Sequence, residues 1–374
     1  MAQRARATQT KKVAGEPAAK KAIPRAAGKS ADGAVTKKPA ARTARTATPP
    51  PAATRTNAAR TNAARTAAPT RTRAGANSVT ADVPVLKTYK LYLGGAFPRS
   101  ESGRTYPVRG PKGEFLANAA QASKKDTRDA VQAARKGFKS WSNATAYNRG
   151  QVIYRIAEML QGRRAQFVDL LVSGEGYRPK AAETAVDAAI DRFVHYAGWT
   201  DKIAAVFGSS NPVAGPFFSF STPEPTGVVG AFAPQQDSLL GLVSVIAPVI
   251  TSGNAVVLVA SQDRPLPAIT LAEVLATSDL PGGVVNVLTG DAAEVGPHLA
   301  AHGDVNALDL TGVSGELRES LARTASGTIK RFYAPHREPD FAASPGTARL
   351  RAFLETKTVW HPTGAVSLAG GGAY

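Results

Sequence analysis

The chain has 374 residues and a formal net charge of +18, and most of that charge lies in the N-terminal fifth of the sequence. It contains no cysteine, which excludes disulfides, thiolate metal sites and a cysteine nucleophile within the chain. No apolar run reaches the ~20 residues that cross a bilayer, and the N-terminus lacks the apolar core of a secretory signal, so we expect a cytoplasmic protein with no membrane contact.

Residues 1–77 hold 17 of the 46 Lys and Arg residues, two of the 28 acidic residues and almost nothing large and apolar. Such a composition cannot bury enough apolar surface to offset the entropy lost on ordering, so residues 1–80 are expected to form a disordered basic tail. Three roles remain open for it: a solvated tail, non-specific binding of nucleic acid or another polyanion through residues 1–77, and a targeting peptide.

The folded part is expected to start with paired strands and continue with helices. The runs 90–97 and 105–110, separated by turn residues, predict a β-hairpin. Asp126 is the expected N-cap of a first helix, and apolar stripes at helical spacing over 149–173 and 180–204 predict two more.

Residues 226–326 alternate short apolar runs with longer segments of helical spacing, which predicts four consecutive β-α units. The strands are expected at 226–233, 254–261, 282–290 and 305–312, and the helices at 238–253, 265–278, 292–303 and 314–326. Strands that are apolar on both faces and joined by helices form a parallel sheet in a three-layer α/β domain. His298 and His302 have the spacing of a helical metal pair, but two solvated helix residues explain them more simply.

The alternation stops after Lys330. Residues 334–349 have the composition of a loop, and 355–360 are strand-like. A strand that arrives alone after a long loop must pair with a sheet edge, either in its own chain or in a neighbouring one.

Several segments occur in an order and spacing that resemble the aldehyde dehydrogenase superfamily. They are FVHYAGWTDKI (193–203), FFSFSTPEPTGVVGAFAP (217–234), APVITSGNAVVLVAS (247–261), LPGGVVNVLTG (280–290), ALDLTG (307–312) and, as the C-terminal segment, FLETKTVW (353–360). The resemblance implies a Rossmann-like cofactor-binding domain over 85–330 and a C-terminal loop and oligomerisation strand within 331–374. It also implies a small oligomerisation sheet built from 208–225 and 355–360.

The same resemblance implies a catalytic domain with a Cys nucleophile and a Glu that activates water, and this sequence offers no counterpart of either, so no catalytic residue is assigned. The positions that match the family's NAD or NADP contacts have also changed. Val259 stands where the family has a Lys, and Val313 stands where it has a Ser. The candidate cofactor residues, which imply a weakened NAD or NADP site, are Gln236, Ser261, Gln262, Gly290, Gly312 and Ser314.

Three functions follow as hypotheses. The first is a catalytically inactive aldehyde dehydrogenase-like pseudoenzyme, a structural or regulatory subunit that assembles with itself or with an active aldehyde dehydrogenase. The second is an NAD(P)-binding oxidoreductase subunit acting in aldehyde oxidation. The third is a polyanion-binding protein that acts through its basic tail.

Overall fold

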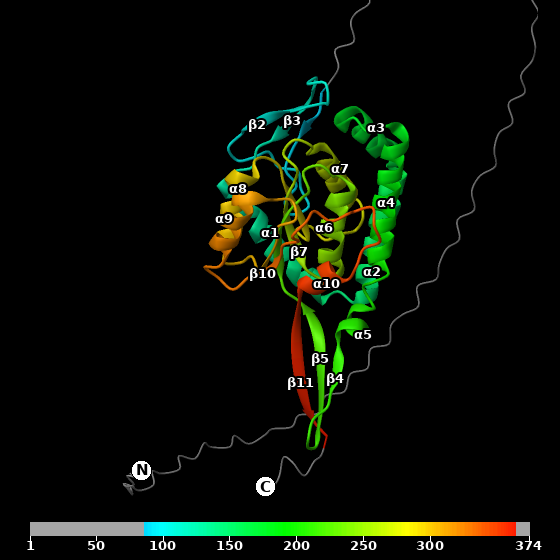
Figure 1. Cartoon of the computed structure of the whole chain (residues 1–374), viewed down its shortest axis with the longest axis vertical. Helices are drawn as coiled ribbons and strands as arrows, with labels where there is room; N and C mark the ends of the chain where they lie inside the picture. Colours follow the sequence, from blue (N-terminus) through cyan, green and yellow to red (C-terminus); the bar gives the residue numbers. More distant parts are fainter. Residues whose placement is uncertain (1–85, 364–374) are drawn as a thin grey trace, which may run out of the picture. The chain divides into compact units, whose positions relative to one another are not determined.

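The computed structural model describes residues 86–363, so the expected disordered tail over 1–80 and the last eleven residues lie outside the described part. A five-stranded parallel sheet lies at the centre, in the order β10-β9-β6-β7-β8 (Figure 1). Its strands are β6 (Val228–Phe232), β7 (Ala255–Val259), β8 (Val285–Leu288), β9 (Ala307–Asp309) and β10 (Arg331–Tyr333). The parallel α/β architecture predicted from the sequence is confirmed.

All four predicted β-α units are present, and each strand is followed by its helix. These helices are α6 (Leu240–Thr251), α7 (Leu266–Leu275), α8 (Ala292–Ala301) and α9 (Gly315–Ala325). The sequence did not reveal β10, a three-residue edge strand that is mostly exposed and therefore has no apolar run to mark it.

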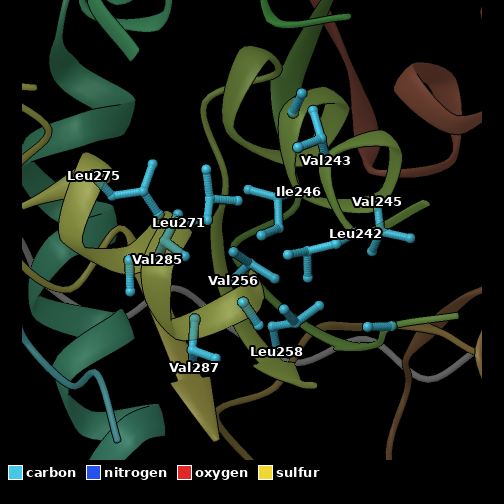
Figure 2. Close-up of a cluster of buried hydrophobic side chains, with 14 of the residues drawn as sticks. Leu242, Val243, Val245, Ile246, Val256, Leu258, Leu271, Leu275, Val285 and Val287 are labelled. Carbon is cyan, nitrogen blue, oxygen red and sulfur yellow. The ribbon is translucent and has the colours of Figure 1, made fainter. Parts of the chain in front are cut away.

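Alternate residues of the strands pack into two separate apolar layers, as the two-residue period of a strand requires. From β7, Val256 and Leu258 join one layer with α6 and α7, while Val257 joins the other. Figure 2 shows the first layer, where side chains of α6 and α7 meet those of β7 and β8. All twelve residues of α6 are buried, which agrees with its nearly continuous apolar sequence.

Four long helices precede the sheet in the chain: α1 (Lys124–Asn143), α2 (Ala146–Gly162), α3 (Arg164–Glu175) and α4 (Pro179–Ala197). Helix α1 packs with α8 and α9 in the second layer, and α2 to α4 cover α6 and α7 in the first. Trp141 of α1 donates a hydrogen bond from Nε1 to the Ile250 carbonyl at 2.8 Å.

Two details of the helix predictions are wrong. Ser123, not Asp126, is the N-cap of α1, and Asp126 is the third residue of a capping box whose carboxylate accepts from the Ser123 backbone at 2.9 Å. The single pattern over 149–173 is two helices, α2 and α3, that meet at Arg163. Both share one apolar stripe, so spacing alone could not reveal the break.

The hairpin predicted between 90–97 and 105–110 is also wrong. Strand β2 (Thr105–Arg109) pairs antiparallel with β3 (Phe115–Ala120), which in turn pairs parallel with β1 (Thr88–Tyr89). Tyr92 forms an isolated antiparallel bridge to Val287 of the central sheet instead. The alanine-rich sequence of β3 carries a weak strand propensity, which hid the true partner.

A three-stranded sheet projects from the body and is called the finger (Figure 1). It contains β4 (Ser209–Asn211), β5 (Phe217–Pro225) and β11 (Leu354–Pro362) in the order β11-β5-β4. A short helix, α5 (Ile203–Phe207), precedes it, and another, α10 (Ala348–Ala352), leads into β11. The lone C-terminal strand therefore pairs with a strand of its own chain, β5.

The hydrogen-bond register of the finger decides which backbone groups remain open. Thr226 N donates to Phe353 O at 3.2 Å, and Thr363 N donates to Pro216 O at 2.9 Å. Hydrogen-bonded and non-hydrogen-bonded pairs alternate in an antiparallel ladder, so the backbone N–H and C=O groups of the odd-numbered residues of β11 point toward β5. The even-numbered ones, such as Thr356, turn their N–H and C=O groups to the open edge. Pro223 and Pro225 of β5 lie opposite even-numbered residues of β11, at positions where the backbone nitrogen is directed away from β11. The N–H that proline lacks is therefore not needed for the hydrogen bonds between β5 and β11.

A buried ion pair connects the central sheet to the segment that enters the finger. Arg349 of α10 binds the Asp309 carboxylate at the end of β9, and these side chains are 7% and 0% exposed. Arg349 also donates to Thr311 Oγ1 at 3.1 Å and lies 4.3 Å from the centre of the Tyr333 ring. Within residues 86–363, no helix combines the length and apolar character needed to cross a membrane.

The Arg349–Asp309 pair is expected to control the stability of the body. Arg349→Met should lower the free energy of unfolding by about 3–5 kcal/mol, because it leaves the Asp309 carboxylate buried without a counter-ion, with only the Thr311 N–H and hydroxyl as donors. The double variant Arg349→Met/Asp309→Leu should lose much less than the sum of the single changes. Urea denaturation measures all three. Lys357→Met, which breaks an exposed pair with Glu224, is the control and should cost about 1 kcal/mol or less. An equal loss in Arg349→Met and the control would contradict this assignment.

Candidate functional site

The carboxyl ends of the five parallel strands meet at one edge of the sheet, and the candidate residues follow those ends. The chain runs outward from β6 through β7 to β8, and then crosses back to β9 on the other side of β6. The strand order therefore reverses between β6 and β9, and open α/β sheets bind ligands at such a switch point.

A cavity of about 220 Å³ lies at this switch point. Three of the six predicted residues line it: Gln236 after β6, and Gly312 and Ser314 after β9. The rest of its wall is formed by the neighbours of these residues in the two turns, by Arg318 of α9 and by residues 335–338. The structure thus brings together half of the candidates in one concave site.

Gly312 has a packing role that is independent of any ligand. A Cβ atom at this position would lie 1.9 Å from the Ala233 carbonyl oxygen, so only glycine lets the end of β9 approach the end of β6. The Gly312 N–H donates to the Phe232 carbonyl at 3.0 Å across this contact.

Gly290 does not line the cavity. It follows β8 at the far side of β7, with a φ of 123°, and a Cβ there would lie 3.2 Å from the Ala122 backbone nitrogen. The left-handed φ and the close backbone explain this glycine as a turn residue.

Ser261 and Gln262 follow β7 and also lie outside the cavity, and both make hydrogen bonds to Gln235 or the turn after it. Ser261 Oγ donates to the Gln235 carbonyl at 3.1 Å and accepts from the Arg264 N–H at 3.2 Å. The Gln262 N–H donates to Gln235 Oε1 at 3.2 Å. Val259, where the resemblance implies a lysine, is 1% exposed within the apolar layer. The resemblance places the adenosine-ribose contacts at these positions, where this chain has the apolar Val259 and the uncharged Gln262.

The opposite side of the cavity retains groups that suit an anion. Ser314 is the N-cap of α9 and lines the cavity, and its side chain makes no capping hydrogen bond. The positive end of the α9 dipole and its uncapped first N–H groups therefore lie at this end of the site. Arg318 lies one turn into α9 and donates to the Pro335 carbonyl at 2.7 Å. The residues present thus fit a pyrophosphate better than a ribose.

Sequence reasoning missed Arg264 and Glu175, which hold the turn that carries Gln236. Arg264 Nη1 donates to the Gln236 carbonyl at 2.7 Å and lies 3.5 Å from Glu175 Oε2. Ser238 Oγ donates to the same carboxylate. The Glu175 side chain is 3% exposed. No sequence signal marks these residues, because Glu175 ends a helix where a solvated carboxylate is ordinary.

Burial raises the pKa of Glu175 to about 7, although the hydrogen bond from Ser238 and the charge of Arg264 oppose the shift. Burial also raises the pKa of Asp237, against hydrogen bonds from the Gly241 and Leu240 backbone and the charge of Arg192. Two carboxyl groups with raised pKa values therefore flank the Gln236 turn.

The structure does not bring together the histidine pair that has metal-ligand spacing in the sequence. His302 is the C-cap of α8 rather than a helical residue, and its Nδ1 accepts from the Asp304 N–H at 3.1 Å, so the His298–His302 pair does not form a ligand set. Among residues 86–363, no group of three or more His, Cys, Asp or Glu side chains is placed to hold a metal ion.

Comparison with known proteins gives a consistent result. The profile of the Aldehyde dehydrogenase family matches residues 97–335. A putative aldehyde dehydrogenase, DhaS, of Bacillus subtilis (strain 168) is 32% identical over 249 residues, which cover 65% of this chain and 49% of that protein. Aldehyde dehydrogenase family 2 member B4 of Arabidopsis thaliana is 31% identical over 265 residues, covering 70% and 48%.

Solved structures agree. The NAD⁺ complex of an aldehyde dehydrogenase from Bacillus cereus superposes with a TM-score of 0.61 and 26% identity, over 66% of this chain and 50% of that one. HpcC from Thermus thermophilus gives 0.62 and 30%, over 66% and 47%. The chain spans about half the length of the curated relatives it matches. The matched profile and the likeness to solved structures together establish that this chain belongs to the aldehyde dehydrogenase family.

Proposed function

We propose that this chain is a catalytically inactive aldehyde dehydrogenase-like subunit that assembles with itself or with an active aldehyde dehydrogenase. The finger is the observation that carries the proposal. Its strand β11 is nine residues long, mostly exposed, and paired on one side only within the described residues. Phe217, Phe218 and Trp360 of the finger are 40%, 49% and 58% exposed. An open strand edge beside exposed aromatic side chains is a template for another chain.

The chemistry of the chain supports the inactive part of the proposal. The family's reaction needs a thiolate that attacks the aldehyde, and this chain has no cysteine. The Ser261 hydroxyl, which lies near the site, has backbone groups as its hydrogen-bond partners among the described residues, the Gln235 carbonyl and the Arg264 N–H, and not a general base. The missing thiol and the exposed finger together favour an assembly role over a catalytic one.

An NAD(P)-binding subunit of an oxidoreductase is the second candidate. The specific observation in its favour is the switch-point cavity, where the N-terminus of α9 and Arg318 suit a pyrophosphate. When bound, such a cofactor supplies hydride acceptance. This chain would contribute the Gln236 turn and the start of α9 to hold and orient the cofactor. The missing ribose contacts argue for weak binding.

Binding of a polyanion through residues 1–77 stays a prediction, because those residues lie outside the described part of the chain. Their charge of +15 is the feature that favours it. A cytoplasmic location likewise stays a prediction.

If the chain assembles through the β11 edge, a proline placed at an outward-facing backbone position of β11 should disrupt the assembly. Thr356→Pro removes an N–H that faces the open edge but leaves the bonds to β5 intact, so it should shift the purified full chain from oligomer to monomer. Light scattering coupled to size-exclusion chromatography measures the mass. Thr356→Val keeps the N–H and should remain oligomeric. A wild-type chain that elutes as a monomer, both alone and with an active aldehyde dehydrogenase, would reject the assembly.

If the chain binds NAD or NADP, a negative charge restored at position 262 should strengthen that binding. Millimolar NAD or NADP should raise the melting temperature of the full chain slightly. Gln262→Glu should enlarge that shift, because the resemblance places a ribose-binding Glu here. Gln151→Glu, a change to an exposed residue on α2, should behave as wild type. No shift with either nucleotide, in wild type and in Gln262→Glu, would exclude this second candidate.

The buried Glu175 predicts a pH-dependent stability near the site. Its pKa rises from 4.5 to about 7 on folding, so the folded state holds this proton more tightly than the unfolded state. The stability that the proton confers is complete below pH 4.5 and is lost as the pH rises through about 7. Between about pH 5 and pH 8, the wild type should lose up to about 3 kcal/mol of unfolding free energy from this group.

Glu175→Gln should flatten this part of the profile and be the more stable protein at about pH 8. Urea denaturation across the pH range provides the measurement. Glu183→Gln, a change at an exposed carboxylate, should leave the slope unchanged. A wild-type slope that survives in Glu175→Gln would show that another group is responsible.

A further inference from the structure

A second cavity, also of about 220 Å³, lies between α4, α6, β10 and the segment 339–349. It shares no lining residue with the switch-point cavity. Its polar wall contains Arg192 and Tyr196 of α4, Ser244 of α6, Tyr333 of β10 and Arg349 of α10. A volume of this size holds about seven water molecules, or one small organic molecule.

Arg192 brings a buried positive charge to this wall. It is 7% exposed, and its guanidinium donates to Ser244 Oγ at 2.9 Å and to the Phe341 and Ala343 carbonyls at 2.6 and 3.1 Å. All three acceptors are neutral, and no carboxylate among residues 86–363 forms an ion pair with it. A buried charge without a counter-ion is unfavourable, so an anion in the cavity would stabilise this arrangement.

The Tyr196 hydroxyl is the second, independent sign of a ligand. The residue is 2% exposed and lines the cavity, yet its hydroxyl makes no hydrogen bond with any part of residues 86–363. Burial raises the pKa of Tyr196, while the charges of Arg349 and Arg192 lower it, so both guanidinium groups act on this hydroxyl. The hydroxyl opens to the cavity beside two cations, where a ligand can supply the partner that the described residues do not.

The charge balance of the wall limits what the partner can be. Arg349 is paired with Asp309, whereas Arg192 has no directly paired carboxylate within residues 86–363 and feels only the more distant charges of Asp191 and Asp237. Asp340, exposed at the rim, disfavours a doubly charged ligand. Phe341 and Ala348 supply apolar surface beside the polar groups.

We propose that this cavity binds a small organic monocarboxylate, whose carboxylate accepts hydrogen bonds from Tyr196 and the Arg192–Ser244 pair. The apolar part of the ligand lies against Phe341. The site is independent of the cofactor and assembly proposals, because it uses neither the switch-point cavity nor the finger.

Calorimetric titration and thermal melting of the full chain test the proposal with butyrate as the probe, at constant ionic strength. Butyrate should bind and raise the melting temperature with concentration. Butyramide, which has a similar shape and no charge, should bind much more weakly, and so should inorganic phosphate. Equal shifts from butyrate and butyramide, or a larger shift from phosphate, would overturn the assignment of a monocarboxylate.

Tyr196→Phe is the decisive variant, since it removes a hydroxyl that the fold does not use. The variant should melt no lower than the wild type, yet bind butyrate about tenfold more weakly, because it loses one hydrogen bond to a charged group. Tyr154→Phe, a change to an exposed tyrosine of α2, is the matched control and should bind as the wild type does. Wild-type butyrate affinity in Tyr196→Phe would overturn the proposal.

Discussion

The constraint on which this structure depends is that both faces of its central sheet must be kept from water. Val256 and Leu258 point to one apolar layer while Val257 points to the other, so neither layer alone can hold β7. Only helices on both sides satisfy such a strand, and connections through helices make the strands parallel. Parallel strands then end at one edge, which is why turns from distant parts of the sequence meet around one cavity.

That same constraint explains how much could be predicted from the sequence. The four β-α units were predictable, because strands buried on both faces leave continuous apolar runs such as the one over 255–259. The wrong or missed predictions lie in segments whose side chains give no clear signal for a strand or for a helix end. Strand β3 is alanine-rich, β10 has three residues, and a shared apolar stripe hides the break between α2 and α3.

The candidate site residues likewise divide into those that strand order brings together and those that it does not. Gln236, Gly312 and Ser314 follow the two strands that flank the switch point, so strand order alone brings them together. Gly290 and Ser261 follow strands farther along the sheet, and their roles are set by local backbone contacts. Arg264, Glu175 and Arg192 could not be predicted. Their partners are backbone carbonyls or residues distant in sequence, and only the folded chain brings these together.

The two edges of the finger are unlike, and this difference limits how many chains an edge-to-edge contact can join. The β11 side offers a nine-residue edge, whereas the β4 side has three paired residues followed by Pro223 and Pro225, which lack an N–H on that side. A β11 edge that meets the same edge of a second copy forms an isologous pair and leaves no long edge unused. A head-to-tail contact would need the short, proline-blocked side. The finger can therefore present an open strand and still end its own association at a closed two-fold pair instead of a growing fibre.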